Sequence, residues 1–310
     1  MKSNKPSAVL LAFAAVITCL TWPSAVLLCF RLGAKAFGIS LFGLGLSLGP
    51  GLGVYAIVPR MRKQWARRVV LFIGGLSVMA FSLFGAVNLD MEGFFTLVFA
   101  GTMGAAIGHD LVTVIVGPML FGRLVCGWGC WRSMVLELLP IGRSPGRRRG
   151  AWTFLAFGGL AATAGIGALS VLRSGHHAGG TPGGLRVSSL GWIALGFGVY
   201  YAASIGLAFV LKDQRAFCKY LCPNSAILRV TSRFSLLKMS AKRELCNACG
   251  ACSQICPMDI DVAQFAARGF RVASGDCILC QHCAHACPTG ALRLTAGLDM
   301  ARETPFILRP

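Results

Sequence analysis

The amino-acid sequence predicts an α-helical membrane bundle of about six transmembrane helices, followed by a small, cysteine-rich α+β domain. Three observations predict this fold class. Hydrophobic residues make up 55% of the 310 residues and charged residues only 13%, which is typical of membrane proteins. Long apolar stretches alternate with short basic loops. Most of the 14 cysteines lie near the C-terminus, where one ligand spacing is written twice.

Each predicted span is an apolar stretch long enough to cross about 30 Å of hydrocarbon at about 1.5 Å per residue. Gly49-Pro50-Gly51 interrupts the second stretch, so we expect a kink or a re-entrant turn there. The six stretches cover residues 7–30, 36–58, 69–89, 94–122, 151–172 and 190–211.

The charges predict how the chain lies in the membrane. If the loops alternate from a cytoplasmic N-terminus, all lysines and arginines are cytoplasmic except Arg31, Lys35, Arg173 and Arg186. This predicts a multi-pass protein of the bacterial inner (cytoplasmic) membrane with both termini in the cytoplasm. The N-terminal segment shows no twin-arginine export signal, in agreement with this topology. Because the basic residues lie in loops between apolar runs, the expected partner is membrane lipid, and no nucleic acid is expected.

Eight cysteines near the C-terminus have the spacing of bacterial two-cluster ferredoxins. The runs are Cys246-x2-Cys249-x2-Cys252-x3-Cys256-Pro257 and Cys277-x2-Cys280-x2-Cys283-x3-Cys287-Pro288. In this motif the fourth cysteine of each run ligates the other cluster. We therefore expect two [4Fe-4S] clusters, one held by Cys246, Cys249, Cys252 and Cys287 and the other by Cys277, Cys280, Cys283 and Cys256.

Zinc is the alternative for these two runs, but structural zinc explains neither the third cysteine of each run nor the Cys-Pro steps. The motif predicts a domain that carries single electrons. It divides the chain into a transmembrane domain at 1–235, a two-cluster ferredoxin domain at 236–297 and a C-terminal tail at 298–310.

A second, less obvious repeat lies between the apolar stretches. The segment from Arg123 to Leu136 aligns without gaps to the segment from Arg215 to Leu228. Both copies contain Cys-x3-Cys, a spacing that would place both sulfurs on one side of a helical turn. Related positions on packed helices are expected to bring the four thiols together at the inner membrane face. These cysteines are Cys126, Cys130, Cys218 and Cys222.

Three interpretations of the four thiols stay open. They could hold a third [4Fe-4S] cluster, bind a soft metal such as Cu(I), or be small buried hydrophobic residues. A redox role is favoured, with a shared cluster as its commonest form, because packing alone gives no reason for the repeat. The neighbouring Trp128, Trp131 and Tyr220 are interpreted as aromatic residues of the membrane interface.

Quinone is a candidate substrate, and a quinol site needs a proton acceptor close to the first redox centre. His109 and Asp110 lie midway along the apolar stretch 94–122, where ionisable residues are candidates for function. The alternative role of this pair is a hydrogen bond between two helices. Glu137, seven residues after Cys130, is interpreted as a solvated carboxylate among inner-face arginines.

The order of these motifs over about residues 94–296 resembles the membrane polyferredoxins of the NapH type and their NosR-type and MauN-type relatives. The resemblance implies an inner-membrane quinol dehydrogenase component or electron conduit. Such a protein would move electrons between the quinone pool and a partner redox protein of a respiratory or periplasmic oxidoreductase system. The family pattern is CxxxCP twice; Cys222-Pro223 matches it, whereas Trp131 follows Cys130.

Two other functions are considered for the same motifs. The CcoG type, a further relative, implies a cupric reductase or metalloenzyme assembly factor. A redox-sensing regulatory membrane protein is the third hypothesis.

Overall fold

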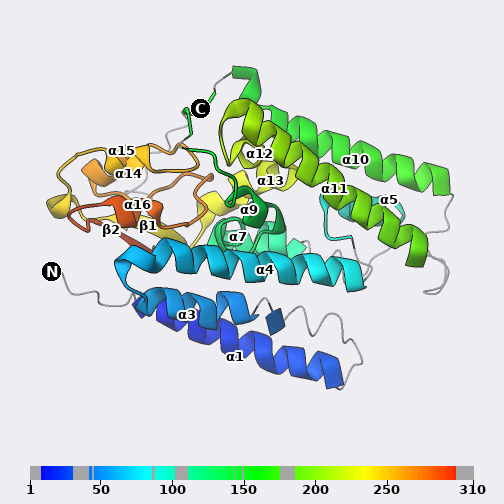
Figure 1. Ribbon diagram of the computed structural model, residues 1–310, viewed down its shortest axis with the longest axis horizontal. Helices are drawn as coiled ribbons and strands as arrows, with labels where there is room; N and C mark the ends of the chain where they lie inside the picture. Colours follow the sequence, from blue (N-terminus) through cyan, green and yellow to red (C-terminus); the bar gives the residue numbers. More distant parts are fainter. Residues whose placement is uncertain are drawn as a thin grey trace.

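The computed structural model describes residues 8–30, 42–43, 45–85, 88–101, 111–142, 144–148, 150–174 and 186–297. Long helices flank a central group of short, broken helices, and a small α+β domain lies at one end of this bundle (Figure 1).

Among the described residues, four helices are long and apolar enough to cross a membrane. They correspond to the predicted spans at 7–30, 69–89, 151–172 and 190–211, so a helical bundle with several apolar spans is confirmed. These helices are α1 (Ala8–Phe30), α4 (Lys63–Gly85), α10 (Leu155–Ser174) and α11 (Arg186–Leu211).

The predicted span at 36–58 has no helix of crossing length in the described part of the chain. Its apolar helix covers only Gly45–Ile57. Within it, α3 (Pro50–Ile57) begins at Pro50, because proline has no N–H to donate and its φ suits the first turn of a helix. The helix α3 packs against α1 and α4. A new helix start at Pro50 agrees with the expected kink.

The predicted span at 94–122 is divided as well. The short helix α5 (Met91–Phe99) ends before Gly101, whose φ is +67°. Farther along lie a π-helical turn, η2 (Val112–Val116), and α7 (Gly117–Phe121). The chain then bends by 85°. The bend lies at Gly122, where φ is +60°, a conformation that glycine adopts without strain.

The internal repeat found in the sequence is reproduced element by element. Its first copy forms α8 (Leu124–Trp128) and α9 (Trp131–Leu136), and its second forms α12 (Ala216–Tyr220) and α13 (Pro223–Thr231). Arg123 and Arg215 occupy the N-cap of the first helix in each copy.

The C-terminal domain is built on a two-stranded antiparallel sheet. Strand β1 (Leu237–Ala241) pairs with β2 (Leu292–Ala296), and Met239 lies opposite Leu294. Short helices connect the strands: η6 (Arg243–Leu245), α14 (Ala251–Gln254), α15 (Val262–Arg268) and α16 (His282–Ala286). The other short helices are η1 (Arg60–Arg62), η3 (Gly150–Thr153) and η5 (Ser232–Phe234).

One hydrophobic core crosses the predicted domain boundary at 235/236. Tyr55 and Trp128 of the helical bundle belong to the same buried cluster as Met239 and Ile278 of the C-terminal domain. The small domain is therefore packed onto the bundle rather than tethered to it. The tail at 298–310 lies outside the described residues.

Neighbouring glycines of α10 offer a matched test of this packing. A Cβ at Gly159 would lie 2.4 Å from the carbonyl oxygen of Leu221, whereas a Cβ at Gly158 would meet nothing within 4 Å. We expect Gly159→Ala to lower the free energy of unfolding by about 1–3 kcal/mol through overpacking. Gly158→Ala should leave it unchanged or raise it slightly, because alanine favours the helix. Thermal unfolding in detergent measures the stability of both variants, and equal shifts of the unfolding temperature would contradict the packing of Gly159 against Leu221.

Candidate functional site

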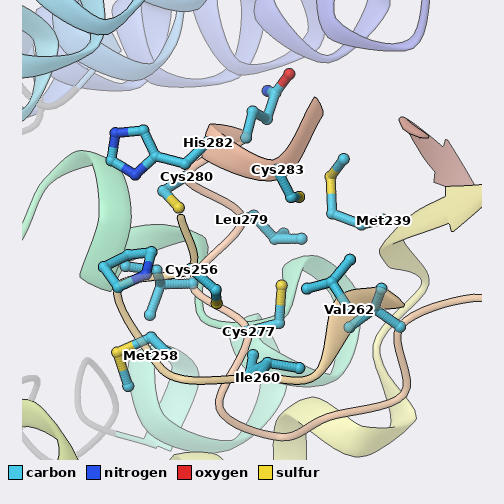
Figure 2. Close-up of a pocket in the computed structure, with 14 residues that line it drawn as sticks. Met239, Cys256, Met258, Ile260, Val262, Cys277, Leu279, Cys280, His282 and Cys283 are labelled. Atoms are coloured by element: carbon cyan, nitrogen blue, oxygen red, sulfur yellow. The ribbon is translucent and has the colours of Figure 1, made fainter. Parts of the chain in front are cut away.

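The C-terminal domain contains two cavities, and each is lined by four cysteines. Figure 2 shows the first, in which the sulfur atoms of Cys256, Cys277, Cys280 and Cys283 face one shared space. The second is lined by Cys246, Cys249, Cys252 and Cys287. In each cavity three cysteines come from one run and the fourth from the other. These sets are the same as the two crossed ligand sets expected from the motif.

Unusual backbone conformations shape the two cysteine loops in the same way. Ala248 and Leu279, each just before the second cysteine of its run, have φ of 55° and 52°. Gly250 and Gln281, each just after that cysteine, have φ of 75° and 60°. Non-glycine residues adopt such left-handed conformations at some cost in energy, and they gather at functional sites. The repeated strain curls each loop so that three sulfurs point inward.

Burial sets the protonation of the thiols in the first cavity. It raises the pKa of Cys277 to about 12 and that of Cys256 to about 11. Because only thiolates ligate metal, occupation of this cavity would release protons. Cys287 of the second cavity differs. Its burial also raises the pKa, but hydrogen bonds from Thr289 and from the backbone N–H of Ala291 outweigh this effect and lower it.

The four cysteines of the internal repeat lie within electrostatic range of one another, since Cys222 interacts with the charges of Cys218, Cys126 and Cys130. The expectation that Cys-x3-Cys occupies one helical turn is wrong, because Cys126 lies in α8 while Cys130 caps α9 in an extended conformation. Cys130 packs against α4: a Cβ at Gly75, midway along that helix, would lie 3.2 Å from the carbonyl oxygen of Cys130.

Two arginines hold the copies of the repeat together reciprocally. Arg123 of the first copy donates to Ser225 Oγ of the second at 3.1 Å. Arg215 of the second copy donates to Ser133 Oγ of the first, and to the carbonyl oxygen of Cys126 at 3.3 Å. Ser133 and Ser225 occupy matching positions, so the exchange has the symmetry of the repeat. Each arginine therefore fixes the cysteine segment of the other copy.

Six cations around these segments share two carboxylates. Arg67, Arg68 and Arg215 pair with Glu137, while Arg123, Arg147 and Arg229 pair with Asp276. The interpretation of Glu137 as a solvated carboxylate is wrong, since its side chain is only 8% exposed and lies between two buried guanidinium groups. Burial alone would raise the pKa of Asp276, but Arg123, Arg147 and Arg229 lower it to about 2.

The first cavity of the C-terminal domain abuts the repeated motif. Leu279, between two cysteines of that cavity, accepts a hydrogen bond of 3.0 Å from Trp128 Nε1, two residues after Cys126. A Cβ at Gly127 would lie 2.3 Å from the carbonyl oxygen of Ile278, so only glycine allows this approach. Trp128 also packs edge-on against Tyr55.

The sequence suggested that the aromatic residues of the motif lie at the membrane interface. The structure shows instead that they are packed inside the protein. Trp128, Trp131 and Tyr220 are all buried. Trp131 packs edge-on against Phe197 and Tyr201.

Sequence reasoning missed a polar cluster next to the four thiols. Arg132 pairs with Asp90, and the hydroxyl of Tyr200 donates to Glu92 Oε2 at 2.8 Å. The only sequence signal was the pair of acids between two apolar stretches. The proton-site candidates His109 and Asp110 lie outside the described residues.

Comparisons with known proteins associate both cysteine constellations with iron–sulfur binding. A family model described as a 4Fe-4S dicluster domain matches residues 238–295. Another, described as a 4Fe-4S binding domain, matches residues 111–147 and 195–242, which include both copies of Cys-x3-Cys. The chain is thus a 4Fe-4S iron–sulfur protein.

The methylamine utilization ferredoxin-type protein MauN of Methylorubrum extorquens is 30% identical over 203 residues, which cover 62% of this chain and 68% of that protein. The chain belongs to the MauN/NapH type of membrane polyferredoxins. This confirms the resemblance seen in the motifs. As a family member it is a ferredoxin-type 4Fe-4S electron-transport protein that associates with membranes.

Other relatives match shorter segments. MauN of Paracoccus denitrificans is 35% identical over 91 residues, 26% of this chain and 32% of that protein. YccM of Escherichia coli, named as a candidate electron transport protein, is 30% identical over 97 residues, 31% of this chain and 26% of that protein. The chain thus spans about a third or less of these two relatives. No solved structure matches it.

Replacing Glu137 tests the shared carboxylate. Glu137→Gln would leave two buried guanidinium groups, those of Arg67 and Arg215, without an anion. We expect the free energy of unfolding to fall by about 3–5 kcal/mol, as when one partner of a buried pair is removed. Glu244→Gln, at an exposed position, is the matched control and should unfold like the wild type. Thermal unfolding in detergent decides, and equal stability of both variants would contradict the role of Glu137.

Proposed function

We propose that this polyferredoxin conducts electrons through three iron–sulfur centres that lead from the cytoplasm into the membrane bundle. Cys246, Cys249, Cys252 and Cys287 would hold the first [4Fe-4S] cluster. Cys256, Cys277, Cys280 and Cys283 would hold the second. The third, at Cys126, Cys130, Cys218 and Cys222, would exchange electrons with quinone in the membrane.

The observation that carries this proposal is the hydrogen bond from Trp128 to Leu279. Leu279 lies between Cys277 and Cys280 of the first cavity, and Trp128 lies two residues after Cys126. Electron transfer needs redox centres held close together, and this contact joins the first cavity directly to the membrane cysteines. The second cavity reaches the protein surface, since Cys249 is exposed. It would receive or deliver electrons at the cytoplasmic surface.

Charge balance supports a third cluster over simple packing. Six cations around the repeat share the carboxylates of Glu137 and Asp276. An unbalanced positive charge in a low-dielectric interior is unfavourable, and an anionic group beside it restores the balance. A [4Fe-4S] cube with four thiolates carries a net negative charge, so the residues present fit this group. A bound cluster would supply one-electron transfer, and the arginines would hold its ligands in place.

The predicted membrane topology and the named relatives suggest where the protein acts and with what kind of partner. A bundle of six spans in the bacterial inner membrane, with both termini in the cytoplasm, would place the C-terminal domain on the cytoplasmic side. The relatives named for methylamine utilization suggest that a partner redox protein of a respiratory or periplasmic oxidoreductase system completes the pathway.

Iron content tests the number of centres. The wild type should contain about twelve irons, and a variant with Cys126, Cys130, Cys218 and Cys222 all changed to Ala about eight, because each cube holds four. EPR during dithionite titration should show the third signal only in the wild type, and a quinol analogue should reduce only the wild type. A variant with Cys19 and Cys29 changed to Ala is the control for cysteine replacement and should behave like the wild type.

Three results would point elsewhere. About eight irons in both proteins would exclude the third cluster. Oxidation of the reduced clusters by Cu(II), lost when Cys218 or Cys222 is replaced, would indicate a cupric reductase instead. Clusters that respond to oxidant but sustain no turnover with any acceptor would indicate a sensor.

Gly127 provides a separate test of the route between the second and third centres. In Gly127→Ala, the added methyl group would meet the carbonyl oxygen of Ile278 and push the cluster loop away from α8. We expect slower reduction of the C-terminal clusters by a quinol analogue, at unchanged iron content. Gly142→Ala, where the Cβ meets nothing within 4 Å, is the control. Stopped-flow absorbance measures the rate, and wild-type rates in Gly127→Ala would contradict this route.

A further inference from the structure

Two carboxylates lie inside the helix bundle, on the side of the membrane cysteines that faces away from the C-terminal domain. Asp90 caps α5, and Glu92 lies in its first turn; each is only 7% exposed. Figure 1 shows α5 beside α10 and α11, toward the end of the bundle opposite the C-terminal domain. A buried carboxylate is unfavourable unless a cation or a hydrogen-bond donor offsets its charge, so the partners of these two residues matter.

Arg132 connects these carboxylates to the thiols. Its Nη1 lies 3.9 Å from Cys222 Sγ, and its Nη2 donates to Asp90 Oδ1. The guanidinium group also stacks on the ring of Tyr200, 4.0 Å from the ring centroid. One cation therefore serves both a thiol and a carboxylate. A change of charge at the thiols alters the positive potential that Arg132 presents to the acidic side.

Glu92 is held by a hydroxyl rather than by a cation. Its Oε2 accepts a hydrogen bond of 2.8 Å from the hydroxyl of Tyr200, and none of the ion pairs in the described residues includes it. A neutral hydroxyl offsets a buried negative charge less than a cation does. Asp90, in contrast, is paired with Arg132. Glu92 can thus bind a proton without breaking an ion pair.

Two unpartnered polar atoms belong to the helices that carry Arg132 and Tyr200. Arg132 Nε and Ser204 Oγ are buried and have no hydrogen-bond partner among the described residues. Ser204 follows Tyr200 by one helical turn on α11 and precedes Ala208, which packs with Leu136 and Cys218. Buried polar atoms of this kind are commonly satisfied by ordered water.

We propose that Glu92 exchanges a proton with water whenever the redox centre at the four membrane cysteines gains or loses an electron, with Tyr200 and Arg132 as positioning residues. The inference rests on the proposed function. When the centre accepts one electron from its donor, the Glu92 carboxylate binds one proton. When the centre passes the electron on, Glu92 releases that proton. One charge balances the other, and no further reactant is consumed.

The surroundings of Glu92 contain few other groups that could take this role. Tyr200 faces it from α11, and Arg132 and Asp90 form the adjacent ion pair. The helix α10 packs along α5 but has no acidic, basic, histidine, cysteine or tyrosine residue between Leu155 and Leu172.

The test is the midpoint potential of the membrane centre, measured by EPR redox titration of the full-length protein at several pH values. In the wild type the potential should fall by about 59 mV for each tenfold drop in proton concentration, the value for one proton per electron. Glu92→Gln should remove this dependence. Tyr201→Phe is the matched control, because the Tyr201 hydroxyl donates to the carbonyl oxygen of Trp131 rather than to an acid, and it should keep the dependence.

Each outcome decides between the inference and the proposed function. A membrane centre with a pH-independent potential in the wild type overturns the inference alone. An unchanged slope in Glu92→Gln also overturns it. A wild type without any signal from the membrane centre removes the proposed function, and the inference with it. If Glu92→Gln loses iron, Tyr200→Phe replaces it as the test variant. The inference then requires that the midpoint potential of this variant depends on pH over a different pH range from the wild type.

Discussion

Buried guanidinium groups are the constraint on which the rest of the structure depends. Arg123 and Arg215 reach across the internal repeat to Ser225 and Ser133, so neither cysteine segment is fixed without the other. A charged group in this interior needs an anion, and Asp276 lies in the C-terminal domain. The pairing of Arg123 with Asp276 therefore joins the assembly of the bundle to the docking of the cluster domain.

This docking also explains why the C-terminal domain shares a core with the bundle. Trp128 and Tyr55 pack with Met239 and Ile278 in one buried cluster, and Trp128 donates to the backbone of the cysteine loop. Apolar contact supplies most of the attraction, while ion pairs and hydrogen bonds determine the orientation. A domain held in this way keeps its first cavity at a fixed distance from Cys126. A flexible linker would not provide that constancy.

The sequence predicted what is local and could not predict what is brought together by folding. The ferredoxin runs, the internal repeat and four apolar spans were visible because spacing and hydrophobicity are properties of the chain itself. Glu137 was misjudged because the sequence places it beside arginines in a loop, whereas the fold encloses it between Arg67 and Arg215. The role of Asp90 was missed for the same reason, since Arg132 is distant in the sequence.

Trp131 shows how a departure from the family pattern can leave the geometry intact. Proline after cysteine disfavours the helical conformation of that cysteine, and Cys222 before Pro223 has ψ of 118°. Cys130 precedes Trp131 instead and still has ψ of 124°. The Trp131 ring packs against Phe197 and Tyr201, and Arg132 lies above it. These tertiary contacts fix the start of α9, a role that the pyrrolidine ring of Pro223 has in the other copy. Both copies therefore present their second cysteine from an extended residue at a helix N-cap.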